Sequence, residues 1–231
     1  TNKNVINVVK FFKIIIAILR NQSHRLKIDV HFKIILKMPK ARGGADLSKI
    51  GVKDNVTRAE TIFNALFPLI SNFFDIRDKV GLEIGPGDNI NVAFLFLKHR
   101  AKKIYIIEKF NNIYLNKKTT DTLNELDLRY ERKLIALSDV INNNQNKAEF
   151  SSNKICIKTK LFEETKFEEK IDFIYSNDVI EHVRNVNRVF SHAYNILTKD
   201  GVFINNIDFA GHNVFTNNND PLDFLTYNNF I

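Results

Sequence analysis

The stretch VGLEIGPGDN at residues 80–89 decides the fold of this chain. An apolar strand over residues 79–84 leads into a Gly-x-Gly turn, and residues 91–99 after it are expected to be helical. Glycine has no Cβ, so a ligand can approach the backbone closely at such a turn. Ile90 stands where a dinucleotide fingerprint has its third glycine, which disfavours a pyrophosphate site. By itself the turn fits a simple strand-to-helix connection as well as a ligand site.

Helical and strand patterns alternate around this turn. A helix is expected over residues 57–70, where Thr57 and Glu60 have the spacing of a capping box. Another is expected over residues 186–197, followed by a turn at Lys199, Asp200 and Gly201. The other expected strands cover residues 103–107, 154–157, 171–176 and 201–206. This alternation predicts an α/β fold, a doubly wound, Rossmann-like and mainly parallel sheet with helices on both faces.

Residues 110–150 read as a polar, Asn-rich insertion in this pattern. A helix is expected at about residues 120–137, and the run of asparagine and glutamine at 142–146 is expected to be a loop.

Charge is distributed unevenly along the chain, whose formal net charge is +8 over 231 residues. Residues 1–58 hold 13 of the 34 Lys and Arg but only 3 of the 26 Asp and Glu. We therefore divide the chain into a basic N-terminal arm, residues 1–55, and a main domain, residues 56–231. The apolar run at residues 14–19 is too short to span a bilayer. For the arm, we favour a helix packed on the domain over an amphipathic helix on a membrane or a partner.

A single cysteine, Cys156, excludes an internal disulfide framework and any multi-cysteine zinc site, and favours a reducing, cytoplasmic compartment. We expect no metal ion. Asp178, Glu181 and His182 have a spacing that could hold a divalent cation on a helix, but polar contacts that brace a loop are the favoured interpretation.

Glu108 lies 21 residues after Gly87, just past the second expected strand. A carboxylate at that place can accept hydrogen bonds from both hydroxyls of a ribose. Together with Glu83, it fits a nucleoside ligand that carries an amine but no phosphates.

These motifs resemble those of class I S-adenosylmethionine-dependent methyltransferases, in particular the bacterial methyltransferase-11 and -23 types. The stretches IDFIYSNDVIEHV at 171–183 and AYNILTKDG at 193–201 are similar to the family's later motifs. The resemblance implies S-adenosylmethionine as cofactor. It places Glu83, Gly85 and Gly87 around the methionine end, Glu108 at the ribose, and Ser176 and Asn177 near the sulfonium. Lys158-Thr159-Lys160 replaces the usual adenine-binding residue, so the adenine contacts are left unassigned.

The same resemblance implies methyl transfer to a small-molecule acceptor, with a hydroxyl of a sugar or glycan precursor as our first choice. His212 is the candidate general base and Asp208 the carboxylate that orients it. One alternative is an RNA methyltransferase that grips phosphates with the basic arm. The other is a catalytically inactive module that binds the cofactor for assembly. The family sheet has two further C-terminal strands, which we expect to be short or missing here.

Overall fold

The structure is a computed structural model that describes residues 50–208 except 111–112, 131–134, 145–146, 151–152 and 184. For residues 142–144 and 147–149 it describes the backbone only. Most of the basic arm and the candidate base His212 lie outside the described residues, as do the two C-terminal strands that the resemblance implies.

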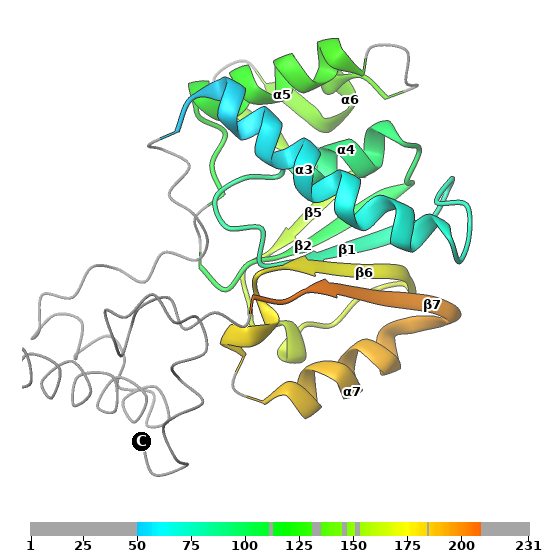
Figure 1. Ribbon diagram of the computed structural model, residues 1–231. Coiled ribbons are helices and arrows are strands. Elements are labelled where there is room, and N and C mark those ends of the chain that lie inside the picture. Colours follow the sequence, from blue (N-terminus) through cyan, green and yellow to red (C-terminus); the bar gives the residue numbers. More distant parts are fainter. Residues whose placement is uncertain are drawn as a thin grey trace, which may run out of the picture. The chain divides into compact units, whose positions relative to one another are not determined.

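Five strands form one sheet in the order β5-β2-β1-β6-β7 (Figure 1). Every neighbouring pair in it is parallel. This confirms the predicted α/β, doubly wound and mainly parallel architecture. The strands are β1 Val80–Ile84, β2 Lys103–Ile107, β5 Ile155–Lys158, β6 Ile171–Asn177 and β7 Leu197–Asn206.

Helices cover both faces of this sheet. Figure 1 shows α3 (Val52–Ser71), α4 (Asn91–Lys98) and α5 (Lys117–Arg129) on one face and α7 (Val186–Ile196) on the other. Shorter helical turns connect them: α6 Leu137–Val140, η2 Phe162–Glu164 and η3 Ile180–His182. Because both faces are covered, apolar side chains of the central strands β1, β2 and β6 point to both sides of the sheet, and most polar side chains of β6 lie near its carboxyl end.

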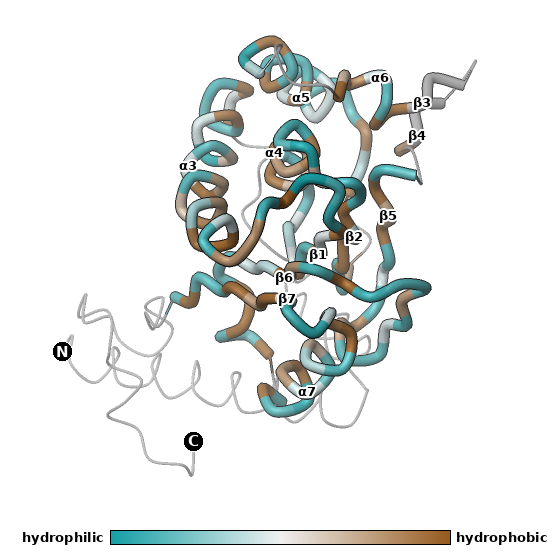
Figure 2. The backbone as a smooth tube through the Cα atoms, turned by 90° about the vertical axis from the view of Figure 1, so that its right-hand side faces the viewer, coloured by the Kyte–Doolittle hydropathy of each residue, from teal (hydrophilic) through white to brown (hydrophobic). Residues whose placement is uncertain are grey.

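Side chains of the central strands divide between two apolar cores. Leu82 and Ile84 of β1 pack in the core beneath α7. Phe173 and Tyr175 of β6 belong to the core beneath α3 and α4. Figure 2 shows the resulting hydrophobic colouring along β2 and β5. Glu83 points to the α3 and α4 side, because side chains alternate along a strand and its neighbours Leu82 and Ile84 face α7.

The predicted start of the first helix is wrong. α3 begins at Val52 after the N-cap Gly51, five residues before the expected cap at Thr57. The Thr57 hydroxyl donates a hydrogen bond to the carbonyl oxygen of Lys53 at 3.0 Å, one turn back, and does not cap a helix start. A threonine inside a helix can satisfy its hydroxyl in this way, so its presence does not require a helix to begin there.

Three further boundaries differ from expectation. The expected helix at 120–137 is instead α5, which ends at Arg129, and the separate short α6. The loop expected at 142–146 is wrong for residues 142–144. They form β3 (Ile141–Asn144), which pairs antiparallel with β4 (Lys147–Phe150) and so satisfies its backbone groups. β7 starts at Leu197, four residues before the expected start at residue 201. Its register against β6 shifts between Ile171 and Phe173, and the turn expected at residues 199–201 lies within the strand.

Candidate functional site

The carboxyl ends of four strands are aligned at one edge of the sheet. Ile84 of β1 pairs with Ile107 of β2 and with Ser176 of β6. Ser176 in turn pairs with Asn205 of β7. The residues that follow each strand therefore meet at this edge, which is where ligands bind in open α/β sheets.

The glycine turn after β1 depends on backbone conformations that other residues avoid. Gly85 has φ of 67° and Gly87 has φ of 84°, both in the left-handed region. The Gly85 N–H donates to the carbonyl oxygen of Ile107 at 2.8 Å, which ties the turn to β2. A Cβ added at Gly85 would lie 2.8 Å from both γ-methyl groups of Val179. This turn therefore requires glycine at position 85 for two independent reasons.

Glu108, directly after β2, holds the turn from the other side. It is only 4 % exposed, and its Oε2 accepts a hydrogen bond from the Gly87 N–H at 3.1 Å. Its Oε1 accepts one from the Phe110 N–H, also at 3.1 Å. Burial raises the pKa of Glu108, while the backbone N–H groups oppose that rise. Each carboxylate oxygen has a further lone pair, so Glu108 can still accept hydrogen bonds from hydroxyl groups of a ligand.

Glu83, in β1 two residues before Gly85, is only 7 % exposed. The Tyr175 hydroxyl donates to its Oε2 at 3.1 Å. Burial raises the pKa of Glu83 to about 8, and the negative charge of Glu108 adds to the rise, whereas hydrogen bonds from Tyr175 and the backbone of Ala93 lower it. Glu83 is therefore mostly protonated at neutral pH until a positive charge approaches it.

Amide side chains organise the other half of the edge. The hydroxyl of Ser176, which is fully buried, donates to Asn205 Oδ1 at 2.7 Å. Asn206 Nδ2 donates to Asn177 Oδ1 at 2.9 Å, and Asn177 Nδ2 donates to Asp178 Oδ2 at 2.7 Å. Sequence reasoning identified Ser176 and Asn177 but missed Asn205 and Asn206. The available signal was two amide residues at the end of the apolar run in β7.

A pocket of about 440 Å³ adjoins this half. Asn177 and Asp178 form one wall of it, and a face of α3 forms the other. The α3 residues are Asp54, Thr57, Arg58, Thr61 and Ile62. Sequence reasoning missed this contribution, although these positions follow the i, i+3, i+4, i+7 spacing of a single helix face.

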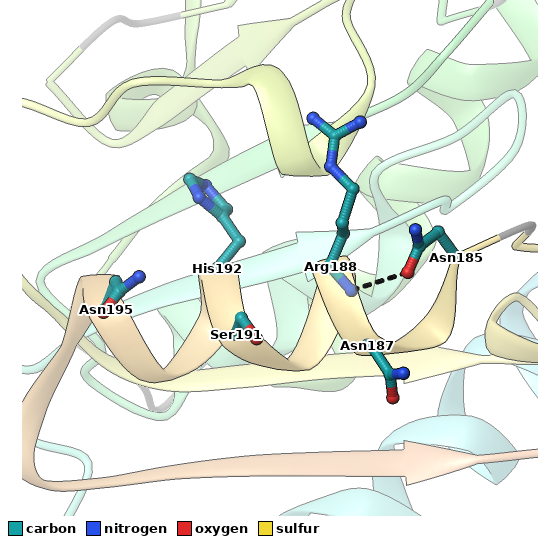
Figure 3. Close-up of a pocket in the computed structure, with 6 residues that line it drawn as sticks. All are labelled: Asn185, Asn187, Arg188, Ser191, His192 and Asn195. Atoms are coloured by element: carbon teal, nitrogen blue, oxygen red, sulfur yellow. Dashed lines mark hydrogen bonds between the residues drawn. The ribbon is translucent and has the colours of Figure 1, made fainter.

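A second pocket, also of about 440 Å³, runs along α7 (Figure 3). It is lined by Asn185, Asn187, Arg188, Ser191, His192 and Asn195. Asn185 caps α7, since its Oδ1 accepts a hydrogen bond from the Arg188 N–H at 3.0 Å. The side chains of Arg188 and His192 extend to the same side of the helix in Figure 3. Burial lowers the pKa of His192, which favours the neutral ring. None of the site residues expected from the sequence lines this pocket.

The remaining expectations concern residues near the chain's later motifs. Asp208 follows β7 by two residues and is partly buried. The 178–182 segment includes η3, where Glu181 Oε1 lies 3.9 Å from His182 Nε2.

Among the residues the structure describes, no group of three or more His, Cys, Asp or Glu is placed to hold a metal ion. The described part of the chain also has no helix long and apolar enough to cross a membrane.

Comparison with known proteins gives the following matches. Residues 58–212, more than half of the chain, match a family model described as a methyltransferase domain. No curated protein matches the chain. Among solved structures, a protein from Methanococcus maripaludis described as an S-adenosyl-L-methionine-dependent methyltransferase is 17 % identical, with a TM-score of 0.42 over 72 % of this chain and 66 % of that one. An S-adenosylmethionine-dependent methyltransferase from Clostridium acetobutylicum is 13 % identical, with a TM-score of 0.39 over 70 % and 52 %. The chain thus spans between half and two thirds of the length of these two structures.

Proposed function

Because the chain belongs to the class I S-adenosylmethionine-dependent methyltransferases, we propose that it transfers a methyl group to a hydroxyl of a small-molecule acceptor. The observation that carries this proposal is the hydrogen bond between Gly87 of the glycine turn and Glu108 at the carboxyl ends of β1 and β2. A pocket beside Asn177 lies at the carboxyl end of β6, the next strand in the sheet. A nucleoside and an acceptor could be held next to each other there.

The residues at this edge fit S-adenosylmethionine. Gly85 and Gly87 place no side chain on the turn and take the left-handed backbone that it needs. Glu108 keeps free lone pairs for the two ribose hydroxyls. In our proposal Glu83, Gly85 and Gly87 surround the methionine end, where the ammonium group of the cofactor would draw Glu83 into its ionised form. Ser176 and Asn177 line the wall beside the sulfonium.

When bound, the cofactor supplies an electrophilic methyl group whose bond to sulfur breaks in line, with the electron pair going to sulfur, as the acceptor oxygen bonds to carbon. The proton of the acceptor hydroxyl must then go to a base. We assign that role to His212, oriented by Asp208, and a base of this kind contributes roughly 10²–10⁴-fold in rate. The cytoplasm is the compartment that we propose, on the basis of the single cysteine.

Two measurements test this proposal. Calorimetry with S-adenosylmethionine and S-adenosylhomocysteine should show binding to one site, and absence of binding would overturn the proposed function. His212→Ala and His212→Gln should lower methyl transfer strongly and leave cofactor affinity unchanged. Unchanged turnover in both variants would remove His212 from the mechanism. Cofactor binding without transfer to any acceptor would support the inactive module instead.

A second function is favoured by the charge of the N-terminal arm, where residues 1–58 hold 13 Lys and Arg. An RNA methyltransferase that uses the arm to grip phosphates should bind RNA with an affinity that falls steeply as salt rises. Removal of residues 1–49 should abolish that binding. The same arm could give peripheral contact with an anionic membrane, which vesicles with and without anionic lipid would detect.

A further inference from the structure

Seven of the residues that the structure describes line the pocket beside Asn177. Six of these are polar or charged and Ile62 is apolar, but the carbon atoms of the side chains contribute at least as much of the lining surface as the oxygen and nitrogen atoms. Pockets for small molecules combine apolar surface with a few polar groups that fix the orientation of the ligand. This lining therefore suits a ligand that presents several hydroxyl groups together with C–H faces, as a sugar ring does.

The α3 wall offers charged groups that are free to bind. Asp54 and Arg58 are exposed, and within the part of the chain that the structure describes neither side chain forms a hydrogen bond or an ion pair. The hydroxyls of Thr57 and Thr61 donate to backbone carbonyls of their own helix, at 3.0 and 2.8 Å, and keep their lone pairs. The wall thus presents one carboxylate, one guanidinium and two hydroxyl acceptors.

The β6 wall is fixed in advance. Asp178 has φ of 54°, and its N–H donates to the carbonyl oxygen of Asn206 at 3.0 Å. Its Oδ2 accepts a hydrogen bond from Asn177 Nδ2 at 2.7 Å. Left-handed backbone in a residue other than glycine costs about 1–3 kcal/mol and is often found where a side chain must be held for binding. The network therefore holds the carboxylate of Asp178 at the pocket wall opposite α3.

The charges on the two walls do not cancel. Among the lining residues that the structure describes, there are two carboxylates, Asp54 and Asp178, and one guanidinium, Arg58, so this part of the lining carries an excess negative charge. Carboxylates accept hydrogen bonds from hydroxyl groups, and a guanidinium donates to their oxygens. A phosphate dianion would be repelled by the excess charge.

We propose that this pocket binds the methyl acceptor and selects an uncharged polyol of about monosaccharide size over a phosphorylated one. The inference rests on the proposed function, because it assigns the acceptor of that same site. A volume of about 440 Å³ accommodates one sugar ring and its hydroxyls. The selectivity comes from Asp54 and Asp178, and Arg58 contributes affinity by donating to hydroxyl oxygens.

The test measures methyl transfer from labelled S-adenosylmethionine to neutral hexoses and deoxyhexoses and to their 6-phosphates. At least one neutral sugar should be methylated with kcat/KM about tenfold or more above that of its phosphate, which corresponds to about 1.4 kcal/mol. Asp54→Asn should reduce this preference by about tenfold. Arg58→Met should raise KM for the neutral sugar and leave kcat nearly unchanged. Asp121→Asn, which removes an exposed carboxylate on α5, is the charge-matched control and should change neither value.

With sugars as acceptors, three results would overturn the inference: a phosphorylated acceptor preferred over the neutral sugar, an unchanged preference in Asp54→Asn, or no neutral sugar methylated. In the last case, ligand-observed NMR with the S-adenosylhomocysteine complex should also show no sugar binding. A short RNA methylated equally by the wild type and Arg58→Met would count against it in the same way. Calorimetry separates the two proposals, since a chain that binds S-adenosylmethionine but no sugar loses only this inference. A chain that does not bind the cofactor loses both.

Discussion

The two halves of the functional edge are built in different ways. At β1 and β2 the contacts involve mainly backbone groups. Two glycines in left-handed conformation form the turn, and the carboxylate of Glu108 accepts hydrogen bonds from backbone N–H groups. At β6 and β7 the contacts join side chains from residues 29 positions apart, as in the pairs Ser176 with Asn205 and Asn177 with Asn206. The first half tolerates few residue types, whereas the second can change its side chains and keep its strands.

This difference suggests a division of labour. A cofactor shared by a whole family needs a constant backbone shape, which glycines and one buried carboxylate provide. An acceptor differs from enzyme to enzyme, and side chains on neighbouring strands and on α3 can vary to suit it. Changes in the first half should therefore affect folding and cofactor affinity most, and changes in the second half mainly the acceptor.

The largest effect is expected for Gly85→Ala. The left-handed conformation and the contact with Val179 together should lower the free energy of unfolding by about 3 kcal/mol and abolish cofactor binding. Chemical denaturation and calorimetry measure the two effects. Gly51→Ala is the matched control, because Gly51 has φ of −71° and its nearest neighbour to an added Cβ is 3.5 Å away. Equal losses in the two variants would show that position 85 has no special requirement.

Removing the carboxylate that locks the turn should cost less. Glu108→Ala leaves the N–H groups of Gly87 and Phe110 without their acceptor, and should lower the free energy of unfolding by about 2 kcal/mol. Glu108→Gln keeps one acceptor oxygen and should lose about half as much. Cofactor affinity should fall in the same order. Glu168→Ala, at an exposed glutamate, serves as control, and identical behaviour of all three variants would contradict the role of Glu108.

The pH dependence of stability should reveal Glu83. Its pKa is about 8 in the folded chain against an ordinary 4.5, so the folded chain keeps a proton that the unfolded chain releases. The free energy of unfolding should therefore fall as pH rises from about 5 to 8. Relative to Glu83→Gln, which stays neutral, the wild type should lose roughly 2 kcal/mol between pH 6 and 8. Denaturation series at several pH values measure this, with Glu168→Gln as control. Parallel curves for wild type and Glu83→Gln would refute the buried, protonated carboxyl.

The smallest effect is expected in the second half of the edge. Ser176→Ala and Asn205→Ala each remove one partner of a hydrogen bond of 2.7 Å, and a double-mutant cycle should give a coupling energy of about 1 kcal/mol. Cofactor affinity should change much less than in Gly85→Ala. A coupling of zero, or a loss of cofactor affinity as large as that of Gly85→Ala, would remove the distinction between the two halves.

The parts of the structure that could be read from the sequence are those set by neighbours in the chain. The bounds predicted for β2 are those observed, because the apolar run IYII at residues 104–107 lies between charged residues, Lys102 and Lys103 before it and Glu108 after it. The spacing of 21 residues between Gly87 and Glu108 pointed to one site, and the two residues are hydrogen-bonded in the structure. The proposed roles of these residues toward a cofactor remain predictions until binding is measured.

The wrong predictions concern residues whose usual preference gives way to a hydrogen bond with a residue a few positions away in the chain. Thr57 resembles a helix cap, but its hydroxyl bonds to Lys53 within a helix that starts at Val52. Residues 142–144 have the composition of a loop, yet pairing with β4 makes them a strand. Local composition could not reveal either outcome, since each depends on a hydrogen-bond partner that the local pattern does not specify.

The sequence by itself determined the order of strands and helices and the glycine turn, because apolar periodicity and the absence of a Cβ act over a few residues. The tertiary structure alone decided that Asn205 meets Ser176, that Asn206 meets Asn177, and that a polar face of α3 stands opposite Asp178. These contacts depend on strand register and on how a helix packs on the sheet. Register and packing are settled by burial of the whole core, so no short stretch of the sequence contains them.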